Sequence, residues 1–99
     1  MRKKVEKFEC DDRYEAEKLA GLLAIQKDDS TYLQSVANVI ENEIVIILKD
    51  SSSHSILLKD NNTAIRLRRL IKDISEGITT IYESRFEHHI ADIIIAFNE

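Results

Sequence analysis

Apolar and polar residues alternate near the N-terminus and then change to helical spacing. From Lys7 to Cys10 every second side chain is apolar, which predicts a half-buried strand in the stretch KVEKFEC. Asp11 or Asp12 can cap the helix that follows, because both precede its first apolar residues. The helix itself is predicted by an apolar stripe at helical spacing: Ala16, Leu19, Ala20 and Leu23. Gly21 destabilises such a helix by roughly 1 kcal/mol unless another group approaches it closely.

The middle of the chain has the pattern of a β-hairpin. The stretches YLQSVANVI and IVIILKD flank the polar residues 41–43, which we interpret as the turn. Five consecutive apolar residues, Ile44 to Leu48, do not alternate with polar ones. We therefore expect this strand to be covered on both faces or to lie in the centre of a sheet. The residues SSSH that follow are expected to form a loop, and SILLKD a short further strand.

A second helix is predicted over residues 61–84, with Asn61, Asn62 or Thr63 as its cap. Its apolar face is formed by residues at helical spacing: Ala64, Leu67, Leu70, Ile71, Ile74, Ile78 and Ile81. The tail, residues 86–99, is rich in β-branched side chains that would fit a strand. We favour a helix there because four apolar residues have helical spacing: Ile90, Ile93, Ile94 and Phe97.

The stretch TAIRLRRLIKDIS combines basic residues with the apolar face of the second helix. Arg66 and Arg69 are expected opposite the apolar face, where they would be solvated like most charges on an amphipathic helix. Arg68 is expected beside the apolar face. From there it can lay its methylene groups on apolar surface and direct its guanidinium group to a carboxylate or phosphate. These three arginines are therefore candidate contacts to a phosphate or to an acidic partner.

The order of these elements predicts an α+β fold in one domain, residues 1–99. We expect a small antiparallel sheet of β-α-β-β-α order, two helices on one of its faces and an additional C-terminal helix. The net charge of −4 does not favour DNA or an anionic membrane as a partner. The single cysteine excludes an internal disulfide, and no apolar signal segment is visible. We expect a cytoplasmic protein, or a nuclear one in a eukaryote.

No residue pattern in the sequence calls for catalysis. Two glycines cannot form the glycine-rich loop of a nucleotide-binding motif. The loop Asp50–His54 contains the residue types of a catalytic triad, but neighbours in one loop are normally solvated rather than convergent. His88 and Asp92 have the spacing of two metal ligands on a helix, but no third ligand accompanies them. We expect no catalytic residue, no metal site and no cofactor.

Three stretches carry a family resemblance: YEAEKLAGLLA, VANVIENEIVIIL and AIRLRRLIKDISEGITTIYE. Together, over about residues 5–85, they resemble the small dimerising subunit of the KEOPS complex, whose animal relatives are the L antigen (cancer/testis antigen) proteins. Leu67 and Arg68 fall at the Leu-Arg pair of that family. The chain departs from the family at Ile25-Gln26, where the family has Pro-Asp or Pro-Glu, and in an insertion of about ten residues, SSSHSILLKDN. The tail from residue 86 has no counterpart.

The resemblance implies an accessory subunit without catalysis. KEOPS makes threonylcarbamoyladenosine at position 37 of tRNA, and the helices of the small subunit dock on the catalytic subunit. The resemblance thus makes tRNA a possible contact of Arg66, Arg68 and Arg69 within the complex. The residues that this docking would use are Leu19, Leu23, Leu70, Ile74, Ile78 and Ile81. The sheet would pair with a second copy or a paralogue as a dimer, through Val36, Ile44, Ile46 and Leu48.

Two other classes of function fit the same sequence. A small acidic inhibitor or immunity-type binding protein agrees with the length and the net charge of −4. A stand-alone RNA-binding module of α+β shape is disfavoured, because the chain has neither a GxxG loop nor aromatic RNP-type strands.

Overall fold

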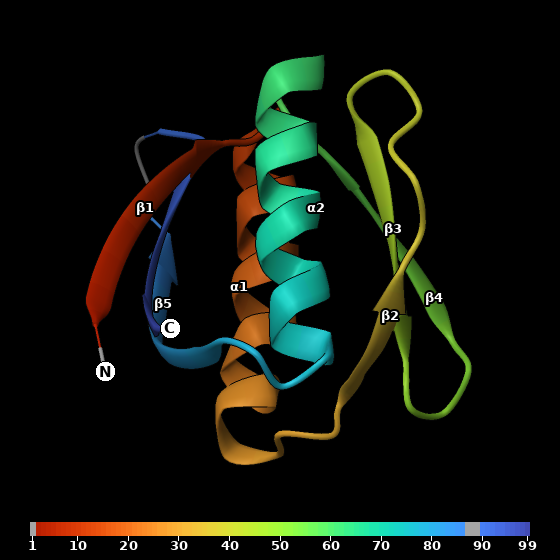
Figure 1. The fold of residues 1–99 in the computed structure, drawn as a ribbon. Helices are drawn as coiled ribbons and strands as arrows, with labels where there is room; N and C mark the ends of the chain where they lie inside the picture. Colours follow the sequence, from red (N-terminus) through yellow and green to blue (C-terminus); the bar gives the residue numbers. More distant parts are fainter. Residues whose placement is uncertain (1, 87–89) are drawn as a thin grey trace.

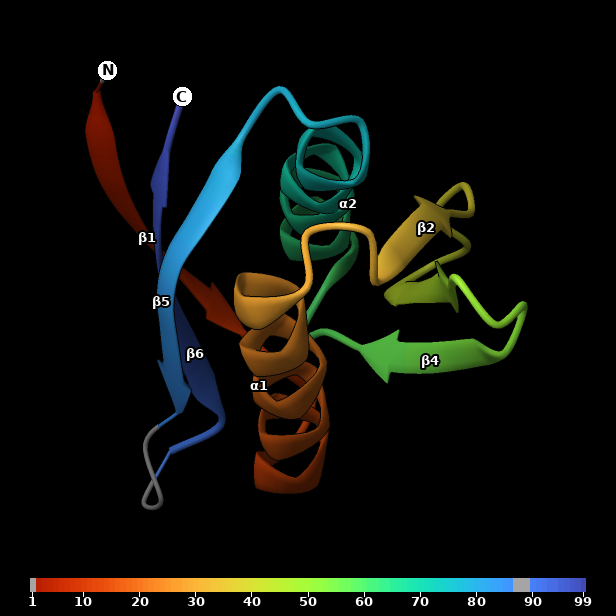
Figure 2. The same ribbon diagram turned by 90° about the horizontal axis from the view of Figure 1, so that it is seen from below.

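Two α-helices lie between two three-stranded antiparallel sheets in the computed structural model, which describes residues 2–86 and 90–99 (Figures 1 and 2). The first sheet, here called the terminal sheet, has the order β1-β6-β5; its strands are β1 (Lys3–Glu9), β6 (Asp92–Asn98) and β5 (Thr80–Phe86). The second, here called the hairpin sheet, consists of β2 (Leu33–Val36), β3 (Glu43–Leu48) and β4 (Ser53–Leu57). The α+β class is confirmed, whereas the single sheet with both helices on one face is wrong. The predicted β-α-β-β-α order is wrong as well, because β4 precedes the second helix and β5 and β6 follow it.

The helix α1 (Arg13–Asp28) begins where the sequence predicts. The side chain of Asp12 accepts a hydrogen bond from the backbone N–H of Glu15 at 2.9 Å, as an N-cap residue does. The apolar stripe of the helix is buried, and α1 packs mainly on β5 and β6. In Figure 1, α1 and α2 (Asn61–Ser75) begin at the same end of the molecule and run in the same direction.

The helix α2 is shorter than predicted at its C-terminal end. Its N-cap is Asp60, whose side chain accepts from the N–H of Thr63 at 2.8 Å, so the cap predicted at residues 61–63 is wrong. The helix ends because Gly77 has a φ of +77°. The N–H of Gly77 then bonds to the carbonyl of Ile74, and the N–H of Ile78 to the carbonyl of Asp73, which together form a Schellman motif. The chain continues from there into β5.

The hairpin sheet is built around β3. As predicted, β2 and β3 pair in antiparallel fashion, and β3 is the central strand with β4 on its other side. The burial of β3 alternates: Ile44, Ile46 and Leu48 are buried, and the residues between them are half-buried. The strand β4 includes Ser53 and His54, which were predicted to lie in a loop.

The tail forms a strand, and the prediction of a C-terminal helix is wrong. The strand β6 pairs with β1 on one side and with β5 on the other, so it is the central strand of the terminal sheet. Ile93, Ile95 and Phe97 are buried under the helices, with half-buried residues between them. So short an apolar run fits the spacing of a strand as well as the spacing of a helix. The segment forms a strand because β1 and β5 pair with its backbone on both sides.

Candidate interaction surfaces

Most of the apolar residues predicted to bind a partner lie in the core. Five of the six predicted docking residues are buried: Leu19, Leu23, Leu70, Ile74 and Ile81. The sixth, Ile78, follows α2 and is 62% exposed. Among the predicted dimer residues, Ile44, Ile46 and Leu48 are buried and Val36 packs against the core. These residues hold the helices and sheets together, so contacts with another molecule must use other side chains.

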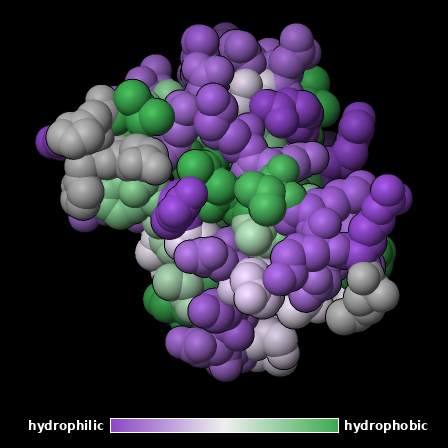
Figure 3. Space-filling view, turned by 90° about the vertical axis from the view of Figure 1, so that its left-hand side faces the viewer, coloured by the Kyte–Doolittle hydropathy of each residue, from purple (hydrophilic) through white to green (hydrophobic). Residues whose placement is uncertain are grey.

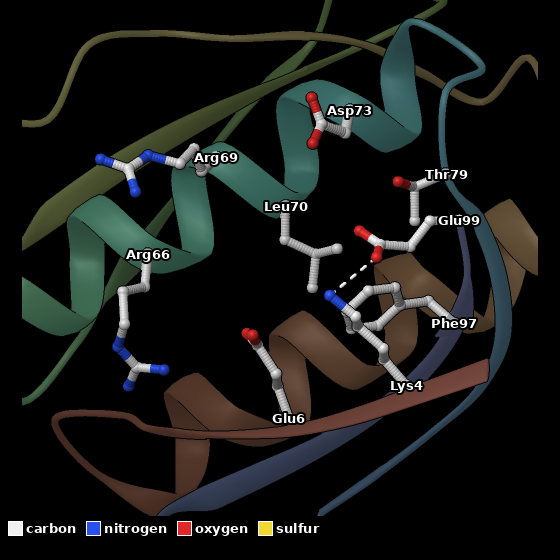
Figure 4. A pocket seen from close by; sticks show the side chains of 9 residues that line it. All are labelled: Lys4, Glu6, Arg66, Arg69, Leu70, Asp73, Thr79, Phe97 and Glu99. Atoms are coloured by element: carbon white, nitrogen blue, oxygen red, sulfur yellow. Dashed lines mark ion pairs between the residues drawn. The ribbon is translucent and has the colours of Figure 1, made fainter. Parts of the chain in front are cut away.

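The three arginines of α2 do not form one basic patch. The guanidinium group of Arg66 lies 5.0 Å from the centre of the Phe8 ring, on the side of the terminal sheet. Arg68 points to the opposite side, where its Nε donates a hydrogen bond to the carbonyl of Ala37 at 3.1 Å. Arg69 extends from α2 in a direction different from that of Arg66 (Figure 4). Arg68 therefore connects α2 to the chain after β2.

A small charged cleft lies between α2 and β1 (Figure 4). Its volume is about 240 Å³, and its charged side chains are Lys4, Glu6, Arg66, Arg69, Asp73 and Glu99. Three of these are basic and three are acidic, and Lys4 pairs with Glu99 at 2.7 Å. Because the charges balance, the cleft offers no net attraction to a phosphate or to a cation.

A second, more apolar groove lies between α1 and the edge strand β5. Its volume is about 520 Å³, and it is lined by Glu17, Ala20, Gly21, Ala24, Ser84, Arg85 and Phe86. A Cβ atom placed on Gly21 would meet no atom of another described segment within 4 Å, so none of residues 2–86 and 90–99 fills the space above this glycine. Within the described part of the chain, the close approach that would justify Gly21 is therefore not made.

The outer face of the hairpin sheet is nearly free of charge. Strand alternation places six side chains of β3 and β4 on this face: Glu43, Val45, Ile47, Ser53, Ser55 and Leu57. Only Glu43 is charged, and Ser35 of β2 lies opposite Ile47. We call these residues the neutral face.

The outer face of the terminal sheet is mostly charged. It carries Lys3, Lys7, Glu9, Glu83, Arg85 and Asp92 around a small apolar centre of Val5, Ile94 and Ala96. Figure 3 shows this side of the molecule as largely hydrophilic, with a hydrophobic patch in the middle. The amino group of Lys3 lies 4.0 Å from the centre of the Tyr82 ring, and Lys7 lies 3.6 Å from Asp92.

The residues of triad type form a capped turn. The hydroxyl group of Ser52 donates to Asp50 at 2.6 Å and lies 3.1 Å from Nε2 of His54. These contacts lower the pKa of Asp50, chiefly through the hydrogen bond from Ser52. Because the serine proton goes to the carboxylate, His54 is not placed to remove it, and this order of contacts does not activate a nucleophile.

Metal binding and membrane insertion have no support in the part of the chain that the structure describes. Within residues 2–86 and 90–99, no group of three His, Cys, Asp or Glu side chains could hold a metal ion. The predicted metal pair includes His88, which lies outside the described residues. Neither described helix is long and apolar enough to cross a membrane.

The buried thiol of Cys10 has its pKa raised to about 12, mainly because burial disfavours the thiolate.

Buried polar side chains connect α1 to the hairpin sheet, and the sequence alone did not indicate them. The carboxylate of Glu15 is buried and accepts the N–H of Leu57 at 2.8 Å. The amide of Gln26 accepts the N–H of Leu33 at 2.8 Å and donates to the carbonyl of Ser30. Glu15 precedes Leu19 by four residues and Gln26 follows Leu23 by three, so both flank the apolar stripe, and their partners satisfy the polar groups buried there.

The chain matches no known family model, and neither a curated protein nor a solved structure is similar to it.

Proposed function

We propose that this protein is a non-catalytic accessory subunit that forms a dimer and binds a partner protein through the neutral face. The observation that carries this proposal is the chemistry of that face: of its six strand residues, only Glu43 is charged. Exposed protein surfaces are usually rich in charge, and the centres of protein interfaces are depleted of it. Val45, Ile47 and Leu57 supply apolar contact area, and the serines supply small polar groups beside it.

The chemistry of the neutral face selects a protein as its partner. Nucleic acid binds through cations that neutralise phosphates, and this face has none. A membrane surface needs a strongly apolar face with basic residues around it, which the serines and Glu43 do not provide. Arg66 and Arg68 of α2 point to opposite sides, and the cleft that Arg66 and Arg69 line has balanced charges, so both features disfavour a stand-alone RNA-binding module.

The family resemblance suggests a specific partner protein with which the proposal can be tested, the catalytic subunit of KEOPS. The resemblance implies docking through the helices, but most of the helix residues it would use are buried between the two sheets. In our proposal the neutral face takes over this docking. The assembly that makes threonylcarbamoyladenosine at position 37 of tRNA is thus the first one to test.

The experiment is a calorimetric titration of the full chain with the KEOPS catalytic subunit from the same source. We expect a complex, and we expect the double variant Val45→Lys/Ile47→Lys to bind at least about ten-fold more weakly, because it places two charges at the centre of the contact. The matched control is Val5→Lys, which adds a lysine at an exposed position on the outer face of the other sheet. This control should bind like the wild type.

Two outcomes would overturn the proposal. One is the absence of any complex between the wild-type chain and the catalytic subunit. The other is an equal loss of binding in the double variant and in Val5→Lys. A parallel titration with labelled tRNA at two salt concentrations adds a third: affinity for tRNA that falls steeply with salt would identify a phosphate-binding protein instead.

A further inference from the structure

We propose that two copies of this chain pair through the edge strand β5, so that the two terminal sheets become one six-stranded sheet. This deepens the proposed function, because it names the surface through which the subunit would form its dimer. The first observation is the open edge. The strand β5 is the last strand of the order β1-β6-β5, and among the described residues its stretch 80–85 has no backbone hydrogen bond to a segment other than β6. An unpaired edge of this kind is a template for another strand.

The two edge strands of the terminal sheet differ in how they are protected against pairing with another strand. The edge strand β1 carries three lysines, Lys3, Lys4 and Lys7, and lysines on an edge disfavour pairing with another strand. The edge strand β5 contains no lysine and has one acidic and one basic residue, Glu83 and Arg85. Pairing between two copies is therefore disfavoured at β1 and open at β5.

The charges of β5 are complementary to a second copy of the same strand. Within the terminal sheet, Glu83 lies opposite Ala96 and Arg85 opposite Ile94, and neither has an ion-pair partner among the described residues. Antiparallel pairing of two β5 strands about Ser84 places Glu83 opposite the partner's Arg85. By symmetry it also places Arg85 opposite the partner's Glu83. Two cross-strand ion pairs form, and opposite charges in such positions stabilise a pair of strands.

The groove between α1 and β5 provides the space that this pairing needs. The helix α1 packs mainly on β5, so an added strand brings a second copy of α1 close to the first. The side of α1 along the groove has small residues, Ala20, Gly21 and Ala24, and no described residue fills the space above Gly21. Small residues allow two helix backbones to approach closely. The second copy thus supplies a close approach to Gly21 that the described residues of one chain do not make.

The experiment measures self-association by sedimentation equilibrium, using the full chain without any partner. We expect the wild type to dimerise. Glu83→Arg or Arg85→Glu alone should raise the dimer dissociation constant about ten-fold or more, because two attractive pairs become two repulsive ones. A mixture of these two variants should form a heterodimer with affinity near that of the wild type, because each Arg again faces a Glu. The double variant Glu83→Arg/Arg85→Glu should form a homodimer for the same reason.

Controls separate this pairing from general charge effects and from misfolding. Glu41→Arg changes the net charge as much as Glu83→Arg does, at an exposed position in the turn between β2 and β3 of the other sheet, and should leave the dissociation constant unchanged. Thermal unfolding followed by circular dichroism shows whether each variant is folded. A monomeric wild type, single variants that dimerise like the wild type, or a mixture without recovery would each overturn the inference. The neutral face and its partner play no role in this assay, so its outcome is independent of the test of partner binding.

Discussion

The two sheets differ in what they present on their outer and inner faces. The terminal sheet has charged residues outside and a largely apolar inner face that includes Phe8, Ile93 and Ile95. The hairpin sheet has an outer face with one charged strand residue, and it is connected to α1 by backbone N–H groups that donate hydrogen bonds to Glu15 and Gln26. A charged outer face with an apolar inner face is what solvent and core alone would produce. The hairpin sheet also has an apolar inner face, but its outer face carries little charge, and this difference is the basis of our proposal that it binds another protein.

The largest expected effect on stability comes from placing a charge on the buried face of β3, and the same charge on its outer face provides the comparison. Ile46 and Ile47 are neighbours in sequence, but Ile46 is fully buried and Ile47 lies on the neutral face. Ile46→Asp should destabilise the protein by more than about 4 kcal/mol and leave it largely unfolded, because it buries an unpaired charge. Ile47→Asp should change the free energy of unfolding by no more than about 1 kcal/mol. Urea unfolding of both variants measures the difference.

This pair of variants tests the alternation on which the neutral face depends. A shift of one residue in the strand would exchange the two faces completely. If Ile47→Asp unfolded the protein and Ile46→Asp did not, the assignment of the neutral face would be wrong, and with it the proposed partner surface.

The second effect concerns the polar connection between α1 and the hairpin sheet. Glu15→Ala should destabilise the protein by about 1–3 kcal/mol, because the N–H of Leu57 loses its acceptor. Glu17→Ala, on the exposed side of the same helix, is the control and should stay within about 0.5 kcal/mol of the wild type. Urea unfolding again provides the measurement. Equal effects of the two substitutions would contradict a specific role for the buried carboxylate.

The sequence predicted the elements whose signals are local. The strand at Lys7–Cys10, the helix after Asp12 and the central position of β3 follow from alternation, capping and an apolar run. The second helix was predicted too long because the isoleucines after Gly77 keep helical spacing by coincidence. Only the left-handed conformation of that glycine, with the bonds it allows, ends the helix at Ser75.

The division into two sheets could not be predicted, because it depends on pairing between distant segments. The strand β6 pairs with β1, near the other end of the chain, and with β5, the strand that precedes it in sequence. A short isoleucine-rich run does not identify either partner. The candidate surfaces depend on the fold in the same way. The sequence predicted Leu70 and Ile74 as partner contacts, but the fold buries both, whereas strand alternation places Val45 and Ile47 on the neutral face.

The smallest expected effect is a dependence on pH at the junction of α1 and the hairpin sheet. Asp29 follows α1 and pairs with Lys49, which follows β3, and it also accepts hydrogen bonds from Thr31. The hydrogen bond from Lys49 is the main cause that lowers the pKa of Asp29 from 3.8 to about 2. The folded state therefore binds this proton more weakly than the unfolded state. The stabilisation by Asp29 is complete above its unfolded pKa of about 3.9 and is lost as the pH falls towards 2.

The measurement compares wild type with Asp29→Asn by urea unfolding between pH 6 and pH 2, a range chosen to span both pKa values. The wild type should be the more stable at pH 6, and the difference in free energy of unfolding should shrink below about pH 4, because protonated Asp29 no longer attracts Lys49. The same series with Asp28→Asn corrects for the loss of one acidic group at a neighbouring exposed position. A difference that stays constant down to pH 2 would show that Lys49 does not hold the Asp29 carboxylate. The junction would then depend on the buried contacts of Gln26, one helical turn earlier, because these carry no titrating group.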